Sequence, residues 1–162
     1  MEKQIAGISY STNKELLNVP LIHAYLCNES YWSKGIPIEV VEKAIENSLC
    51  YGAYIIKDKG APGAYAQHGQ VAFARVVTDY ATFGYLADVF VLGDYRKQGI
   101  SKHLMQFIME TTEPFKLRRF MLATLDAHSL YTQYGFSELK HPERIMEISK
   151  PGVYGDLGNA CT

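Results

Sequence analysis

The residues best suited to chemistry in this 162-residue sequence form a basic run, Tyr95–His103, that contains Arg96, Lys97 and Lys102 but no acid. The hydrophobic pattern places the run between a strand and a helix. A helix N-terminus already carries a partial positive charge, so three cations there are unfavourable unless an anion joins them. Gly99 lets the backbone approach a ligand, and the first N–H groups of a helix have no partner within it. The run therefore predicts a phosphate or pyrophosphate site. The alternative is a solvated basic turn in which the glycine only eases the bend.

Two common phosphate motifs are absent from the sequence, which has no GxxxxGK(S/T) and no GxGxxG after a strand. Their absence argues against a P-loop or a Rossmann nucleotide site. The sequence has instead an apolar strand, Leu86–Val91, followed by R-x-x-G-x-S at Arg96, Gly99 and Ser101 and then by an amphipathic helix. About 30 residues further on, a predicted short helix ends in L-Y-x-x-x-G-F, whose tyrosine is Tyr131.

These two motifs, in this order and separated by a helix and a strand, resemble the coenzyme A loop and the later helix motif of the GNAT acetyltransferase superfamily. Both lie between residues 86 and 136, and a weaker resemblance spans most of the chain. The family pattern has Gly or Ala where this sequence has Ser101, and many members have an Asn that contacts the cofactor where it has Thr124. The resemblance implies an α/β (α+β layered) fold, with a mixed, mostly antiparallel central sheet of six to seven strands flanked by helices.

The resemblance also implies acetyl-CoA as co-substrate and no metal. In the family, backbone groups at the end of the strand before the loop bind the pantetheine arm, and these positions correspond to Val89, Phe90 and Val91. The loop N–H groups would hold the pyrophosphate, and they belong to Arg96, Lys97, Gln98, Gly99, Ile100, Ser101 and Lys102. Tyr131 corresponds to the tyrosine that protonates the departing thiolate while an amine attacks the thioester directly. A tyrosine packed in the core is the alternative interpretation of Tyr131.

Asp88 is the candidate group for the acceptor side, because it is the only charged residue in the predicted strand Phe83–Leu92. If the turn before this strand is centred, residue 75 lies opposite residue 86, and Arg75 becomes a diagonal neighbour of Asp88. Two interpretations stay open. Arg75 and Asp88 form a structural ion pair, or Asp88 lines the acceptor cleft and attracts an ammonium group or relays its proton through water.

Tyr31 and Trp32 stand in a polar loop between the first two predicted helices, a loop that often covers the acceptor in the family. We take them, with Arg75, as candidate substrate-binding residues, while an aromatic anchor for the loop is an equal interpretation of the pair. His128, in the first turn of the later short helix, is a second candidate base, and a surface histidine is its simpler interpretation.

Composition limits the partners. The 16 Lys and Arg balance 17 Asp and Glu to a net charge of −1, which argues against a nucleic-acid coat or a membrane-surface module. Three widely spaced cysteines predict neither a disulfide scaffold nor a zinc site. There is no signal-peptide pattern and no run near the roughly 20 apolar residues of a membrane span. We expect a cytoplasmic protein with no nucleic-acid or membrane partner, and leave a homodimer open.

Changes of hydrophobic period predict strands and helices over residues 1–150, which the resemblance implies form one GNAT-like domain, followed by a C-terminal tail over 151–162. The predicted strands cover residues 5–11, 50–57, 70–78, 83–92, 119–124, 136–139 and 144–149. The predicted helices cover residues 13–27, 38–49, 101–110 and 127–134. A turn is predicted at Asp58–Gly63.

Three functions compete. The first is an N-acetyltransferase that moves the acetyl group of acetyl-CoA to a primary amine of a small molecule or to an amino terminus, in a ternary complex. The second is an acyl-CoA-binding regulatory domain of the same fold without turnover. The third is an unrelated phosphate-binding module. The paired motifs disfavour the third, and Tyr131 with a polar cleft favours the first.

Overall fold

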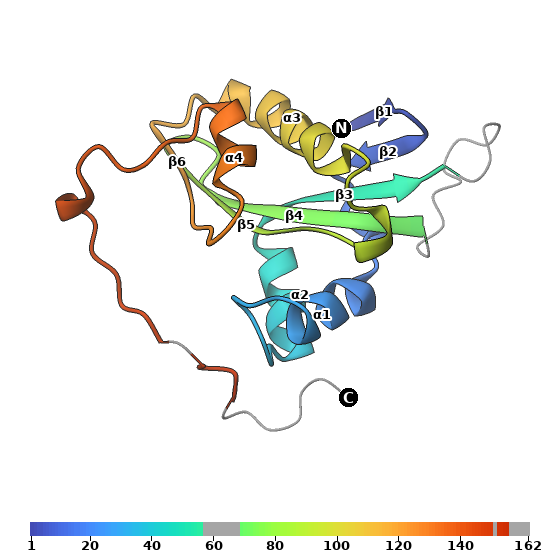
Figure 1. Ribbon diagram of the computed structural model, residues 1–162, viewed down its shortest axis with the longest axis horizontal. Coiled ribbons are helices and arrows are strands. Elements are labelled where there is room, and N and C mark those ends of the chain that lie inside the picture. The colour runs from blue at the N-terminus through green and yellow to red at the C-terminus, as the bar shows by residue number, and fades with distance from the viewer. Residues whose placement is uncertain (57–68, 151, 156–162) are drawn as a thin grey trace.

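The computed structural model describes residues 1–56, 69–150 and 152–155, and a six-stranded sheet forms the middle of this part of the chain (Figure 1). The strands lie in chain order, and each neighbouring pair is antiparallel except β5 with β6, which is parallel. The predicted mixed, mostly antiparallel sheet is therefore confirmed. The strands are β1 Glu2–Ile5, β2 Ile8–Ser11, β3 Leu49–Ile55, β4 Gln70–Thr78, β5 Phe83–Val91 and β6 Arg119–Leu122.

Helices cover both faces of the sheet, with α1 and α2 on one side and α3 and α4 on the other (Figure 1). One buried cluster lies on the α3 side and includes Leu104 and Ile108, and a second lies on the α1–α2 side and includes Ile22 and Val41. No helix in the described ranges is long and apolar enough to cross a membrane. The helices are α1 Val19–Asn28, α2 Ile38–Glu46, α3 Ile100–Thr112 and α4 His128–Tyr131.

The start of the chain departs from the prediction. The single strand expected there is a hairpin of β1 and β2, because Ala6 and Gly7 adopt φ values of 51° and 79° and turn the chain. The first helix begins later than expected, at Val19, because the Asn18 side chain accepts a hydrogen bond from the Leu21 N–H at 3.1 Å and caps the helix there. The turn predicted at Asp58–Gly63 lies outside the described residues.

The two strands predicted at residues 136–139 and 144–149 are wrong. Phe136 still packs on the body, with its ring centroid 5.3 Å from that of Phe120. Beyond it the chain runs away from the sheet (Figure 1), and Met146 and Ile148 are 94% and 91% exposed. Within the described residues the outer edge of β6 has no partner strand. The two segments predicted as strands therefore lack the ladder pairing on which strands depend. The assignment of residues 1–150 to one domain stays a prediction.

The pairing of β4 with β5 is interrupted by a β-bulge at Asp88. Arg75 faces Ala87 while Phe73 faces Phe90, so two residues of β5 stand opposite one residue of β4. Asp88 itself has a φ of 54°, in the left-handed region that a non-glycine residue seldom adopts. A bulge of this kind bends its strand and increases the local twist.

Close to the bulge, β5 separates from its parallel neighbour. The last paired residues are Leu86 and Leu122, and the two strands do not pair beyond them. The predicted register, with residue 75 opposite residue 86, is wrong by one, because Leu86 faces Val76. The bulge nevertheless brings the Asp88 carboxylate to Arg75. The sheet therefore opens between β5 and β6, at the end of β5 that precedes the basic run.

One tyrosine of the core, Tyr10, buries a hydroxyl group whose effect on stability can be measured. Tyr10 is 0% exposed, and its hydroxyl has no hydrogen-bond partner among the described residues. Tyr10→Phe removes this unsatisfied group, which typically costs about 1–3 kcal/mol. We expect the melting temperature at pH 7 to rise by about 2–4 °C per kcal/mol gained in a chain of this size. A lower melting temperature would contradict the absence of a partner.

The stability of Tyr10→Phe should also depend on alkaline pH differently from that of the wild type. Burial raises the pKa of Tyr10 to about 12, while an unfolded tyrosine ionises near 10.0. Unfolding therefore releases a proton between these values, and stability falls as pH rises through them. Tyr10→Phe should lose less stability than the wild type over this interval. As a control, Tyr51→Phe breaks a 2.8 Å hydrogen bond to Thr111 and should lower the melting temperature at pH 7.

Candidate active site

The gap between the separated ends of β5 and β6 contains two adjoining cavities. The first, of about 480 Å³, is lined by Arg75, Asp88 and residues 122–127, and we call it the Asp88 cavity. The second, of about 470 Å³, runs along the end of β5 to the start of α3, and we call it the α3 cavity. The two share wall residues, among them Val89, Tyr31, Trp32, Asp126 and Tyr131.

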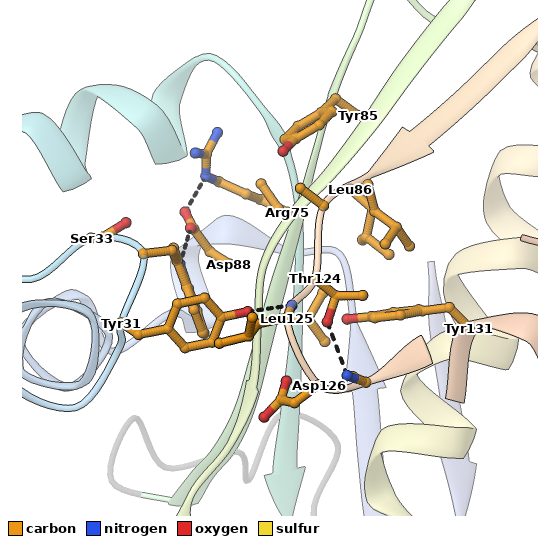
Figure 2. Close-up of a pocket in the computed structure, with 16 residues that line it drawn as sticks. Tyr31, Ser33, Arg75, Tyr85, Leu86, Asp88, Thr124, Leu125, Asp126 and Tyr131 are labelled. Carbon is orange, nitrogen blue, oxygen red and sulfur yellow. Dashed lines mark hydrogen bonds and ion pairs between the residues drawn. The ribbon is translucent and has the colours of Figure 1, made fainter. Parts of the chain in front are cut away.

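Asp88 is held from two sides. Its Oδ2 accepts from Arg75 Nε at 2.5 Å, and its Oδ1 accepts from Trp32 Nε1 at 2.9 Å (Figure 2). Arg75 also donates from Nη1 to Ser48 Oγ at 3.2 Å. The Asp88 side chain is only 8% exposed. The predicted ion pair is confirmed, and Arg75 neutralises the charge of Asp88. Asp88 also lines the cavity, while its part on the acceptor side stays a prediction.

Tyr31 and Trp32 connect the two sides of the gap between β5 and β6. Trp32 bonds to Asp88 on β5, while the Tyr31 hydroxyl accepts a 2.9 Å hydrogen bond from the Leu125 N–H beyond β6 (Figure 2). The two rings meet edge to face with centroids 4.9 Å apart. They remain 55% and 41% exposed, so apolar ring surface faces the solvent at the cavity mouth. The loop is thus anchored to both sides of the gap, and its contact with an acceptor stays a prediction.

Tyr131 stands in the wall common to both cavities. It extends from α4 and is 8% exposed, and Figure 2 shows its hydroxyl pointing toward Thr124. Burial, with smaller contributions from Tyr31 and Asp126, raises its pKa to about 12. The phenol is therefore protonated throughout the physiological range and is available as a proton donor.

The basic run forms a tight turn into α3. Lys97 and Gly99 have φ values of 63° and 79°, and α3 begins with no side-chain cap. The N–H groups of its first turn therefore have no intrahelical acceptor. The Arg96 side chain extends toward β5 and α1, donating from Nε to Val91 O at 3.1 Å and from Nη2 to Tyr25 Oη at 3.0 Å. Its guanidinium holds the end of β5 in place, which the sequence did not reveal.

The structure gathers most of the predicted cofactor residues and leaves some outside the cavity. The α3 cavity wall contains Val89, Phe90, Val91, Arg96, Lys97, Ile100 and Ser101. Gln98, Gly99 and Lys102 adjoin this wall without lining it. Gln98 instead donates to Asp94 O at 3.1 Å, and the carbonyl of Lys102 accepts from Tyr134 Oη at 2.6 Å. The part that each residue plays in binding stays a prediction.

Two further predicted positions are placed away from the α3 cavity. Thr124 lies in the Asp88 cavity, and its Oγ1 accepts from the Ala127 N–H at 3.1 Å, so it shapes the entry to α4. His128 lines neither cavity. Sequence reasoning missed Asp126, which lines both cavities. The only available signal was its position at the start of the segment that leads to Tyr131.

Comparisons with known proteins show the family of the chain. A match to the Acetyltransferase (GNAT) domain family spans residues 46–138. A candidate acetyltransferase of Gibberella zeae is 32% identical over 130 residues, which cover 75% of this chain and 73% of that protein. A crystal structure of a candidate GNAT-family acetyltransferase from Xanthomonas campestris pv. campestris has 44% identity and a TM-score of 0.81, covering 93% of this chain and 99% of that one. The fold is also shared with Rv2747 from Mycobacterium tuberculosis in complex with CoA, at 15% identity and a TM-score of 0.58, covering 81% and 72% of the two chains.

These similarities define the class of the protein. The chain belongs to the GNAT family of acetyltransferases. It is an acetyl-CoA-dependent N-acetyltransferase.

The double contact of Asp88 predicts a stability effect. Asp88→Asn removes the charge that pairs with Arg75 and leaves the guanidinium partly buried without a counter-charge. Hydrogen bonds to charged groups contribute about 1.5–3 kcal/mol, so we expect the free energy of unfolding to fall by about 2 kcal/mol. Urea denaturation followed by Trp32 fluorescence measures it, since Trp32 is the only tryptophan and it contacts Asp88 directly. Glu42→Gln, on the exposed side of α2, is the control and should change stability by less than about 0.5 kcal/mol. Equal stability of Asp88→Asn and wild type would show that the pair is not structural.

Proposed function

We propose that this acetyltransferase moves the acetyl group of acetyl-CoA to a primary amine of a small molecule or of an amino terminus, by direct attack in a ternary complex. The observation that carries the proposal is the opening of the sheet between β5 and β6, with Tyr131 in the wall that its two cavities share. One cavity reaches the first turn of α3, the other contains Asp88, and the exposed rings of Tyr31 and Trp32 line both. A cofactor and an acceptor can therefore meet at Tyr131.

Acetyl-CoA fits the α3 cavity for electrostatic reasons. The uncapped first turn of α3 offers N–H groups and the positive end of the helix dipole to a pyrophosphate. Lys97 adds an exposed cation beside this turn. The pantetheine arm would lie along Val89, Phe90 and Val91, where β5 no longer pairs with β6. Phe90 contributes backbone groups only, because its ring is stacked on Tyr25 at 3.9 Å.

Coenzyme A binding tests this placement. Calorimetry should give much tighter binding for coenzyme A than for pantetheine, which lacks the phosphates. Gly99→Asp should weaken coenzyme A binding by at least tenfold, because a side chain at φ 79° strains the turn and a carboxylate repels the phosphates. Gly99→Asn keeps the strain at similar size without the charge and should weaken binding less. Equal affinity for coenzyme A and pantetheine would refute the pyrophosphate site.

The chemistry assigned to Tyr131 is protonation of the leaving thiolate. The amine nitrogen attacks the thioester carbonyl carbon, the C–N bond forms and the C–S bond breaks. Tyr131 is positioned to donate its proton to the sulfur, since it is neutral and lies between the two cavities. Asp88 would act on the acceptor side through its hold on Trp32 and Arg75 rather than as a free base.

Replacement of this phenol tests the assignment. Tyr131→Phe should lower kcat by about 10²–10⁴-fold, the usual contribution of a general acid, with little change in coenzyme A affinity. Steady-state kinetics on a panel of amines and calorimetry on the same preparation separate the two effects. An unchanged kcat across pH would mean that Tyr131 is structural and that water or another group protonates the thiolate.

The cellular location and the acceptor class stay predictions. We infer a cytoplasmic location and a small-molecule or peptide acceptor from composition and from the resemblance. Binding of coenzyme A without turnover of any amine would favour the regulatory alternative.

A further inference from the structure

Two carboxylates line the Asp88 cavity, Asp88 and Asp126, and they differ in what surrounds them. Asp88 has its charge balanced by Arg75 and both oxygens engaged. Asp126 is exposed and makes no ion pair with any described residue. Figure 2 shows it apart from the Arg75–Asp88 pair. The cavity therefore has one balanced carboxylate and one whose charge is available to a ligand.

The position of Asp126 matters as much as its charge. It lines both the Asp88 cavity and the α3 cavity, so it stands at the junction where acceptor and thioester must meet. The negative charge of Asp126 contributes to the raised pKa of Tyr131. A carboxylate at this junction can contact the ammonium group of an acceptor.

The rest of the cavity wall has the chemistry of a cation site. Among the described lining residues Arg75 is the only cation, and it is paired with Asp88. The mouth carries the exposed rings of Tyr31 and Trp32, which attract cations through their faces. Inside the Asp88 cavity, a phosphate or carboxylate on the acceptor would meet Asp126, and none of the described lining residues there offers an unpaired cation.

On the basis of the proposed function, we propose that Asp126 binds the ammonium group of the acceptor, and that the acceptors are cationic amines whose skeleton carries no anionic group. The nitrogen loses two protons in the reaction. The ammonium gives one proton to water beside Asp126 before attack, and the attacking nitrogen loses the second as the amide forms. Tyr131 gives its own proton to the sulfur and is reprotonated from solvent, so that one proton is released in total.

The test compares a charged and an uncharged nucleophile on one enzyme. We choose 2-phenylethylamine, which is cationic at pH 7, and hydroxylamine, which is mostly neutral there. Asp126→Asn should lower kcat/KM for 2-phenylethylamine by about tenfold, or 1.4 kcal/mol, and leave turnover of hydroxylamine within twofold. Wild-type kcat/KM for 2-phenylethylamine should fall with added salt more steeply than that of the variant, since salt screens exposed charges. Asp126→Glu should recover part of the loss, and Glu42→Gln should match the wild type.

Each other outcome has a definite meaning. Equal loss for both nucleophiles, or an unchanged rate for both, overturns the role of Asp126. Wild-type turnover of hydroxylamine but not of 2-phenylethylamine, or a preference for glucosamine 6-phosphate over 2-phenylethylamine, overturns the acceptor class. Wild-type enzyme that binds coenzyme A by calorimetry yet acetylates neither nucleophile nor any other amine of the kinetic panel overturns the proposed function instead.

Discussion

The site depends on one backbone constraint, the bulge that places Asp88 at a φ of 54° in β5. An unbroken β5 would continue its pairing with β6, and parallel strands paired along their length leave no space between them. The bulge bends β5 next to its last pair with β6. The backbone from Val89 to Val91 therefore does not pair with β6, although Phe90 and Val91 still pair with β4. Its groups on the β6 side are available to a ligand.

The contacts of Asp88 explain how this strained position persists. A non-glycine residue in the left-handed region costs of order 1–3 kcal/mol and persists when surrounding contacts determine it. Asp88 receives an ion pair from Arg75 and a hydrogen bond from Trp32, which together can offset such a cost. The same two contacts tie the Tyr31–Trp32 loop to β5, so the backbone conformation and the cover of the cavity depend on one carboxylate.

Charge is divided along the cleft in a way that suits two different ligands. At the α3 end, N–H groups and Lys97 provide positive potential for phosphates. In the Asp88 cavity Arg75 is neutralised, and Asp126 provides negative potential where this cavity adjoins the α3 cavity. A polyanionic cofactor and a cationic acceptor would therefore be drawn to different parts of the cleft, with Tyr131 between them. Arg96, although part of the basic run, stabilises the end of β5 and the Tyr25 hydroxyl.

Local chemistry made part of this site predictable. Gly99, Ser101 and Tyr131 belong to motifs whose function depends on turn geometry and short helices, so the sequence alone located them. The bulge left no local signal, because its positive φ falls on an aspartate rather than a glycine, and the predicted register was wrong by one residue. Asp126 became a candidate only when the separation of β5 from β6 was visible. The sequence after Gly135 predicts two strands, but a strand also requires a partner, which is a property of the whole fold.

The central claim is that coenzyme A binds at the first turn of α3 and along the end of β5 that does not pair with β6. Amide chemical-shift mapping by ¹H–¹⁵N NMR tests it most directly. Titration with coenzyme A should shift the amides of Val89, Val91 and residues 99–102, with smaller changes along β1 and β2. Shifts confined to the groove between β6 and the segment after Gly135, a separate cavity of about 520 Å³, with none at Val89 or Gly99, would contradict the account.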